Sequence, residues 1–139
     1  MQNQASQIID QMYREDAFSQ WLGIERVEEQ IGRCILRMKV RPEMTNGFGI
    51  AHGGITFSLA DSAFAFASNS QGQKAVSIET SISHTKAVKV GDVLTALAEE
   101  ENLSHKLGIY KVTIRNQSEQ VVALFKGTVY RKSEKWLQE

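Results

Sequence analysis

Apolar and polar residues alternate along most of the second half of the chain, at the spacing of half-buried strands. This alternation predicts four strands, over residues 76–83, 93–99, 107–115 and 121–131, which are separated by a turn around Gly91 and by polar loops. In the first half, residues 33–41 alternate in the same way until Pro42, whose missing N–H ends a strand. A shorter strand is expected to end near Val27. Before it, apolar residues at helical spacing predict one amphipathic helix over residues 4–20.

Residues 54–70 show a different pattern, because apolar residues occupy almost the whole circumference of a helix there. A helix that is apolar on all sides is expected to be buried. One carboxylate, Asp61, lies in the middle of this segment. The residues that share its stripe are Gly54, Phe57, Ala65 and Ser68. Charged side chains are rarely buried without a partner or a function. Asp61 is therefore either paired structurally, or it is a functional carboxylate whose pKa is raised by desolvation.

The order of the expected elements is one helix, two strands, a long buried helix and four strands. Consecutive strands with short loops favour an antiparallel sheet, and a single central helix must be covered by that sheet. We therefore predict an α+β fold in a single domain, residues 1–139, with a curved antiparallel sheet wrapped around the central helix. Apolar residues on both faces of the last strand, among them Val122, Leu124 and Tyr130, indicate that a second copy of the chain packs against it.

The composition argues against several classes of function. Sixteen basic residues balance sixteen acidic ones, whereas a nucleic-acid-binding protein needs a clustered basic excess. The sequence has no apolar run long enough to cross a membrane, and its start does not have the pattern of a signal peptide. The single cysteine, Cys34, fits a reducing compartment and is interpreted as a core residue of its strand. We therefore expect a cytoplasmic protein that binds neither nucleic acid nor membrane.

A glycine-rich segment, Asn46 to Gly54, leads into the central helix. It ends in His52-Gly53-Gly54, which places two glycines where the first N–H groups of the helix can bind negative charge. Such a helix start can act as an oxyanion hole, in which one donor lowers a barrier by about 2.7–4 kcal/mol. Asp61 lies two turns further on, roughly 10 Å from Gly54 along the helix axis. One reacting bond can use both groups only if they come from two facing helices.

Other chemistries fit the chain less well. Gly47, Gly49 and Gly53 come within one residue of the dinucleotide-binding fingerprint, but that motif requires a βαβ unit in a parallel sheet. The three histidines lack the spacing of metal ligands, so we expect no metal site. A G-x-S-x-G elbow, which marks many serine hydrolases, does not occur in the sequence.

Several short motifs are specific when they are taken together at their spacing. They are Asn46-Gly47, His52-Gly53-Gly54, Phe57-Ser58-Leu59-Ala60-Asp61 and Asn69-Ser70-Gln71-Gly72, followed by Gly91-Asp92 and by the run from Val122 to Gly127. In this combination, ahead of four strands, the chain resembles the hotdog-fold acyl-CoA thioesterases of the PaaI (phenylacetyl-CoA thioesterase) type. The resemblance extends along nearly the whole chain.

The resemblance implies a hydrolase that cleaves an acyl-CoA thioester to a free acid and CoA. In such enzymes the residue that matches Asp61 is the catalytic carboxylate, acting as a nucleophile or as a base on water. The N–H group at Gly53 polarises the thioester carbonyl, His52 lies beside it, and Asn46 positions the reacting group. Ser77 matches a hydroxyl residue that orients the water in some relatives.

The resemblance also bears on the substrate and the assembly. Phenylacetyl-CoA and its hydroxylated relatives are the favoured substrates, and Gly54, Phe57 and Ser77 are the expected substrate contacts. The side chains of Phe57, Phe64 and Ala65 would suit a compact aryl group. Because CoA is part of the substrate, no separate cofactor is implied. The site lies between two subunits, with the aspartate of one facing the helix start of the other, and family members are commonly tetramers built as a dimer of dimers.

One departure from the family pattern follows the strand at Ile82, where relatives often have an aromatic residue and then Leu-Arg-Pro. Here the chain reads His84-Thr85-Lys86-Ala87, at a place where acyl or CoA contacts would differ. Two other functions stay open. One is a hydratase or dehydratase on the same fold, with His52 and Asp61 as base and acid, although the proline-rich loop of the dehydratases is missing. The other is an acyl-CoA-binding protein without catalytic activity.

Overall fold

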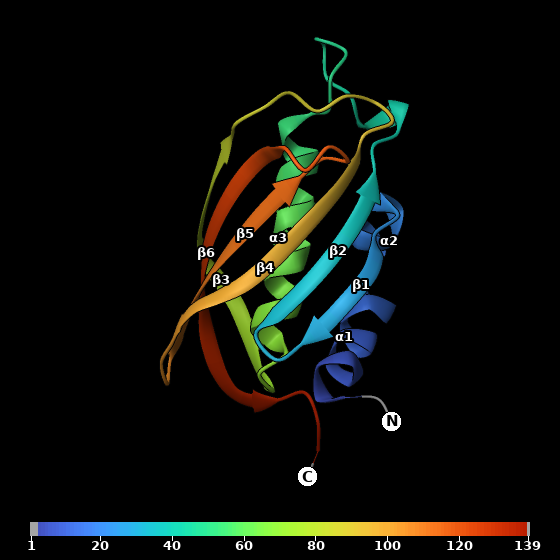
Figure 1. The fold of residues 1–139 in the computed structure, drawn as a ribbon. Coiled ribbons are helices and arrows are strands. Elements are labelled where there is room, and N and C mark those ends of the chain that lie inside the picture. The colour runs from blue at the N-terminus through green and yellow to red at the C-terminus, as the bar shows by residue number, and fades with distance from the viewer. Residues whose placement is uncertain (1–2, 139) are drawn as a thin grey trace.

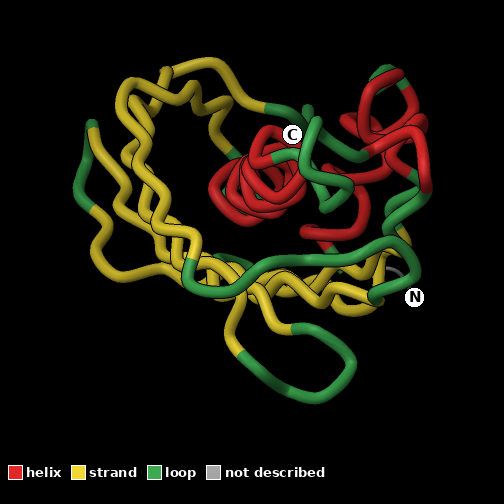
Figure 2. Tube along the Cα trace, turned by 90° about the horizontal axis from the view of Figure 1, so that it is seen from above, coloured by secondary structure: helices red, strands yellow, loops and turns green. Residues whose placement is uncertain are grey.

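A six-stranded antiparallel sheet curves around one long helix in the computed structural model, which describes residues 3–138 (Figures 1 and 2). The long helix, α3, spans Gly53–Asn69. The strands are β1 (Glu25–Gln30), β2 (Arg33–Lys39), β3 (Gln73–His84), β4 (Val93–Leu103), β5 (Leu107–Arg115) and β6 (Val121–Lys135). They lie in the order β1-β2-β4-β5-β6-β3, and every neighbouring pair is antiparallel. The predicted α+β arrangement, a curved antiparallel sheet around a central helix, is confirmed.

Two helices precede the sheet, so the prediction of one helix over residues 4–20 is wrong. α1 spans Gln4–Arg14 and α2 spans Ala17–Leu22. The helix is interrupted because Asp16 caps α2: its carboxylate accepts hydrogen bonds from the Ser19 N–H at 3.0 Å and from the Ser19 hydroxyl at 2.6 Å. α2 then ends at Gly23, which adopts a left-handed conformation. Both helices lie at the β1 end of the sheet, next to α3 (Figure 1).

The centres of β2–β6 match the predictions, whereas β1 continues to Gln30, beyond its predicted end near Val27, and several other strand ends also lie further out. β4 continues to Leu103, so residues 100–103 of the loop predicted over residues 100–106 belong to the strand. β6 continues to Lys135, although the last strand was predicted to end at residue 131. The reason is Trp136, whose indole N–H donates to the side-chain oxygen of Asn69 at 2.8 Å and whose backbone N–H donates to the Gly72 carbonyl at 2.9 Å. These two bonds dock the tail on the end of α3.

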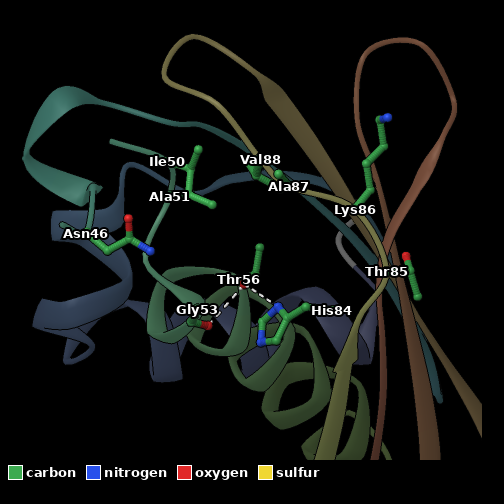
Figure 3. A pocket seen from close by; sticks show the side chains of 10 residues that line it. All are labelled: Asn46, Ile50, Ala51, Gly53, Thr56, His84, Thr85, Lys86, Ala87 and Val88. Carbon is green, nitrogen blue, oxygen red and sulfur yellow. Dashed lines mark hydrogen bonds between the residues drawn. The ribbon is translucent and has the colours of Figure 1, made fainter. Parts of the chain in front are cut away.

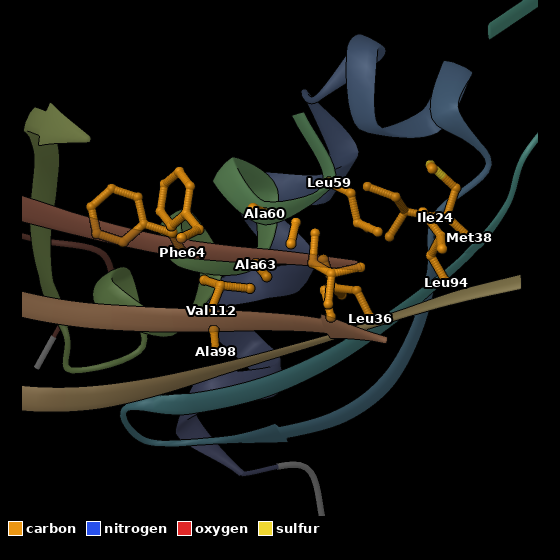
Figure 4. Packing of buried hydrophobic residues seen from close by; sticks show 14 of the residues in the cluster. Ile24, Leu36, Met38, Leu59, Ala60, Ala63, Phe64, Leu94, Ala98 and Val112 are labelled. Atoms are coloured by element: carbon orange, nitrogen blue, oxygen red, sulfur yellow. The ribbon is translucent and has the colours of Figure 1, made fainter. Parts of the chain in front are cut away.

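The hydrophobic core lies between α3 and the face of the sheet that curves around it (Figures 2 and 4). Its members include Leu36, Met38, Leu59, Ala63, Phe64, Leu94, Ala98 and Val112, all of which are buried. Cys34 belongs to the same core, and burial raises the pKa of its thiol to about 12, which confirms the prediction for this residue. Although α3 is apolar, no helix within residues 3–138 is long and apolar enough to cross a membrane.

The outer face of β6 is less apolar than predicted. Val122 is fully buried, because the chain that follows β3 continues alongside it. There the Thr85 N–H binds the Val122 carbonyl at 2.9 Å, and the Lys86 N–H approaches the same oxygen at 3.4 Å. Only Leu124 and Tyr130 of the predicted outer set are exposed, by 48% and 39%. The outer patch expected to receive a second copy is therefore smaller than the sequence pattern indicated.

Candidate active site

α3 has two unlike faces. Its sheet-facing side is closed by fully buried residues: Leu59, Ala60, Ala63, Phe64, Phe66 and Ala67. On the other side Gly54 is exposed, and Phe57, Asp61 and Ala65 are only partly buried. The predicted Asp61 stripe is thus confirmed over most of its length, except for Ser68, which is buried near the helix end. Phe64 was predicted to suit an acyl group, but it points into the core, where its ring packs against Tyr110 and Phe125.

Asp61 lines a cavity of about 330 Å³ between α2 and α3, called here the carboxylate cavity. It is lined by Asp16, Phe18, Ser19, Phe57, Ser58, Asp61, Ser62 and Ala65. Burial raises the pKa of the Asp61 carboxyl above its ordinary value, and the charge of Asp16 raises it further. Within residues 3–138 the Asp61 carboxylate has no ion pair or hydrogen bond. The alternative of a structurally paired aspartate is therefore not observed in the chain.

The start of α3 leaves one backbone donor available. The His52 N–H binds the Met44 carbonyl at 2.8 Å, and the Ile55 N–H binds the His52 carbonyl at 2.9 Å. The Gly54 N–H, which was expected to be available, is instead held by the ring nitrogen Nδ1 of His52 at 2.9 Å, so His52 is the N-cap. Among the described residues, nothing accepts the Gly53 N–H. Gly53 therefore presents the helix N-terminus, with its partial positive charge, to a ligand.

Gly53 opens into a cavity of about 390 Å³, called here the polar cavity (Figure 3). Its lining consists of Asn46, Ile50, Ala51, Gly53, Thr56, His84, Thr85, Lys86, Ala87 and Val88. The Asn46 side-chain oxygen accepts the Phe48 N–H at 2.9 Å, which fixes the amide so that its nitrogen lies on the cavity side (Figure 3). Lys86 is the basic residue of the lining. The cavity thus brings an amide and an imidazole beside the helix start, whereas the Lys86 side chain extends away from it (Figure 3).

His84 is a site residue that the sequence analysis did not single out for a role. The Thr56 hydroxyl donates to the Gly53 carbonyl at 3.0 Å and lies 3.3 Å from Nδ1 of His84 (Figure 3). Since a carbonyl only accepts, the one Thr56 proton points to Gly53, and His84 Nδ1–H must donate to the Thr56 oxygen. The neutral ring therefore carries its lone pair on Nε2. A Cβ at Gly53 would lie 3.3 Å from that atom, so a larger residue there would press on the ring.

The signal that pointed to His84 was the departure from the family pattern over residues 84–87. Its position beside Gly53 could not be read from the sequence, because it depends on β3 ending next to the start of α3. Ser77 shows the opposite outcome: it lies exposed on β3, opposite Val129, and lines neither the polar nor the carboxylate cavity. Within residues 3–138 no three His, Cys, Asp or Glu side chains lie together in a way that could hold a metal ion.

Asp61 and Gly53 do not meet within one chain. They line different cavities and lie eight residues apart on the same helix, which corresponds to about 12 Å along its axis. Asn46 and Gly53 share the polar cavity, whereas His52 and Gly54 face another hollow. A carboxylate and a backbone donor of this kind are the two components of an acyl-transfer site. In this chain they form two separated halves.

Comparison with known proteins gives consistent matches. Residues 48–123, which contain Gly53, Asp61 and His84, match the sequence model of the thioesterase superfamily. A putative esterase of Archaeoglobus fulgidus is 43% identical over 90% of this chain and 81% of its own. The acyl-coenzyme A thioesterase PaaI of Escherichia coli is 40% identical over 94% of both chains.

Solved structures show the same likeness in three dimensions. The E. coli PaaI structure superimposes with a TM-score of 0.93, covering 95% of this chain and 96% of the other at 39% identity. The smu.793 protein of Streptococcus mutans, solved bound to acetyl-CoA, has a TM-score of 0.78 at 29% identity and covers 81% of this chain and 90% of its own. Both proteins therefore share the overall fold of this chain.

Proposed function

The chain belongs to the thioesterase superfamily and has its hotdog fold, and on that premise we propose that it hydrolyses acyl-CoA thioesters to a free acid and CoA. The chain is a thioester hydrolase, because the relatives that it matches include named acyl-CoA thioesterases. One observation carries the finer proposal: a half-buried, unpaired carboxylate lies on the same helix whose first N–H group is available to a ligand. These are the groups that thioester hydrolysis requires.

Gly53 supplies the electrophilic half of the reaction. As a nucleophile adds to the thioester carbonyl, negative charge develops on the carbonyl oxygen. The Gly53 N–H and the dipole of α3 stabilise that charge, and because both are fixed before the reaction they need no reorganisation. The Asn46 amide lies on the same cavity and orients the reacting group. His52 acts on this site through the backbone, because its ring holds the neighbouring Gly54 N–H in place.

Asp61 supplies the nucleophilic half. As a base it takes a proton from water while the oxygen adds to the carbonyl carbon; as a nucleophile its own oxygen adds, and water then hydrolyses the anhydride that results. In both routes the C–S bond breaks, its electron pair leaves on sulfur, and the thiolate takes up a proton. The raised pKa of Asp61 makes the carboxylate more basic than an exposed one, which suits either role.

A second copy of the chain brings the two halves together. Within residues 3–138, β3 is an edge strand whose one partner is β6, and its apolar residues Val76 and Ile78 are 44% and 58% exposed. An unpaired edge of this length is a template for another strand. The Asp61 stripe of α3 is open as well. We propose a two-fold dimer in which Asp61 of one protomer faces Gly53 of its partner, and a dimer of dimers as the assembled enzyme.

The substrate that we favour is phenylacetyl-CoA or a hydroxylated relative. The support comes from the relative E. coli PaaI, a protein described as coming from the phenylacetic acid degradation operon. Phe57 lines the carboxylate cavity next to Asp61 and is a suitable contact for an aryl group, whereas Ser77 lines neither that cavity nor the polar one. A hydratase that uses His52 and Asp61 as a pair is less well supported, because the two residues line different cavities.

The test is release of free thiol from a panel of acyl-CoAs that includes acetyl-CoA and phenylacetyl-CoA. We expect hydrolysis by the unaltered protein and a loss of at least a hundredfold in kcat for Asp61→Asn, with substrate binding retained. Glu101→Gln is the matched control, because it neutralises an exposed carboxylate on β4 and should leave thiol release unchanged. Thiol release that survives Asp61→Asn would remove Asp61 from the mechanism. Hydration of an enoyl-CoA without thiol release would show a hydratase instead. Tight binding of acyl-CoA without turnover would show an acyl-CoA-binding protein.

A further inference from the structure

A second hollow, of about 400 Å³, also reaches the start of α3, and we call it the aromatic groove. It is lined by Phe18, Trp21, Glu43, Met44, Thr45, His52, Gly54, Ile55 and Ser58. It shares the lining residues Phe18 and Ser58 with the carboxylate cavity, so the two hollows are neighbours along α3. The groove therefore lies next to the cavity that contains Asp61.

Two aromatic side chains dominate the groove. Phe18 and Trp21 of α2 are 52% and 48% exposed, and their rings stack with centroids 5.9 Å apart and planes 15° from parallel. Exposed aromatic side chains of this size usually cover or receive something apolar. About half of the surface of each side chain is therefore exposed in a groove that Gly54 and His52 also line.

Arg41 holds this aromatic wall in place. Its guanidinium donates to the carbonyls of Leu22 at 3.0 Å and of Trp21 at 2.6 Å, which are at the end of α2 and lack partners within the helix. The same group lies 4.9 Å from the centre of the Trp21 ring, within the range of a cation–π interaction. Glu43 fixes the guanidinium from the other side through a hydrogen bond of 3.0 Å. Trp21 is thus exposed but held by its backbone and by its ring.

The two hollows at the helix start differ in the way that the two ends of an acyl-CoA differ. The polar cavity offers Asn46, His84 and Lys86, which suit the amides and phosphates of the CoA arm. The aromatic groove offers ring surface, which suits an apolar acyl group. A thioester whose carbonyl binds the Gly53 N–H lies between the two hollows, and its two arms must leave in different directions.

We propose that the acyl group binds in the aromatic groove against Phe18 and Trp21, and that Arg41 is the positioning residue that fixes this wall. The proposal rests on the proposed function and adds the direction in which the substrate lies and the residues that select its acyl group. An aryl acyl group gains apolar contact with the exposed parts of the Phe18 and Trp21 side chains that a two-carbon acetyl group cannot reach. Trp21 therefore sets a preference for aryl over short-chain substrates.

The experiment compares kcat/KM for phenylacetyl-CoA and acetyl-CoA in Trp21→Ala, Phe18→Ala and Arg41→Lys. We expect Trp21→Ala to lower the ratio of the two constants by about tenfold, mainly through KM for phenylacetyl-CoA, with acetyl-CoA hydrolysis within about twofold of the unaltered protein. Arg41→Lys keeps the charge but loses the fork to two carbonyls, so it should lower the ratio by a smaller factor. Trp21→Phe, which keeps an aromatic ring, should retain most of the ratio that Trp21→Ala loses.

Two variants serve as matched controls. Ile31→Ala removes an exposed apolar side chain from the β1–β2 turn, and Arg37→Lys alters a surface arginine of β2 that pairs with Glu25. Neither should change the ratio. A Trp21→Ala variant that hydrolyses both substrates with an unaltered ratio would overturn the proposal while leaving thioester hydrolysis intact. Loss of both activities together with a change in oligomeric mass would overturn it as well, since Trp21 would then be a subunit contact.

A binding measurement separates this proposal from the reaction itself. In Trp136→Phe, the one remaining tryptophan is Trp21. In a protein that carries both Trp136→Phe and Asp61→Asn, the Trp21 fluorescence should change on titration with phenylacetyl-CoA. It should change much less on titration with CoA alone. If no acyl-CoA were hydrolysed by the unaltered protein, the proposed function would fail, yet this fluorescence change would still support the groove as the acyl site. Equal responses to phenylacetyl-CoA and CoA would contradict it.

Discussion

At the scale of single residues, the site depends on groups that are poorly satisfied in the isolated chain. The Asp61 carboxylate is half-buried without a partner, and the Gly53 N–H has no acceptor within residues 3–138. Around them the neighbouring donors are all engaged: His52 caps Gly54, and Thr56 and His84 are linked by their side chains. Unsatisfied groups surrounded by satisfied ones are typical of sites whose missing partner is a ligand.

The raised pKa of Asp61 predicts how stability depends on pH. A carboxyl whose pKa is higher in the folded than in the unfolded chain binds its proton more tightly when folded, so its ionisation opposes folding. That penalty is absent at pH values below the ordinary carboxyl range and is complete once the pH exceeds the raised pKa. Asp61→Asn should therefore increase the free energy of unfolding by about 0.5–2 kcal/mol at pH 7.

Chemical denaturation of the two proteins between pH 4 and pH 8 checks this prediction. The difference between Asp61→Asn and the unaltered protein should shrink as the pH falls, since the protonated aspartic acid and asparagine are then both neutral. A variant that is less stable at pH 7 would mean that the ionised carboxylate is stabilised by contacts in the assembled protein.

At the scale of elements, the close packing of α3 on the sheet positions both halves of the site. Phe64 lies directly over Gly127 of β6, and a Cβ at position 127 would come within 2.6 Å of the Phe64 ring. The ring is itself fixed by Tyr110 and Phe125, so it cannot move away easily. The absence of a side chain at Gly127 therefore sets how closely α3 approaches β6.

Gly127→Ala should destabilise the fold by about 1–3 kcal/mol, because the added methyl group overpacks the core. Gly47→Ala is the matched control, since a Cβ at position 47 would have no atom within 4 Å. Thermal unfolding of the two variants measures the difference. Equal stability of both would show that the core around Phe64 can rearrange without cost.

The elements also show what the sequence could predict and where local patterns fail. Periodicity located α3 and the centres of β2–β6, because each apolar face has to be buried against the core, but it ended the first strand near Val27 whereas β1 continues to Gln30. It missed the break at Asp16, where an N-cap outweighs a continuous apolar stripe. It also missed the last residues of β6, because the hydrogen bond that holds them comes from Trp136, outside the strand. The place of His84 beside Gly53 depends on tertiary structure, which no local pattern contains.

At the scale of the whole molecule, the separation of Asp61 from Gly53 is the observation on which the proposed dimer rests. Besides the stripe of α3, two features of the described residues are open: the edge of β3 that faces away from β6, and the aromatic groove. A two-fold axis that pairs β3 with its copy would also place the two α3 helices side by side. Each dimer would then hold two sites, each built from both chains.

The most direct test of this split site is complementation between two inactive variants. Asp61→Asn removes the carboxylate, and Gly53→Pro removes the N–H at the first position of α3, where proline is tolerated in a helix. Gly53→Ala is the control for added bulk beside His84, because it keeps the N–H. Each of the two inactive variants alone should lose at least a hundredfold in kcat. After the two inactive variants are unfolded together and refolded as a mixture, half of the dimers contain one intact site.

The measurement is the rate of thiol release from phenylacetyl-CoA by that refolded mixture. We expect activity to return to about a quarter of the value for the unaltered protein, because random pairing gives half mixed dimers and each mixed dimer has one intact site of two. Activity that stays at the level of the separate variants would contradict it, since both halves of the site would then have to come from one chain.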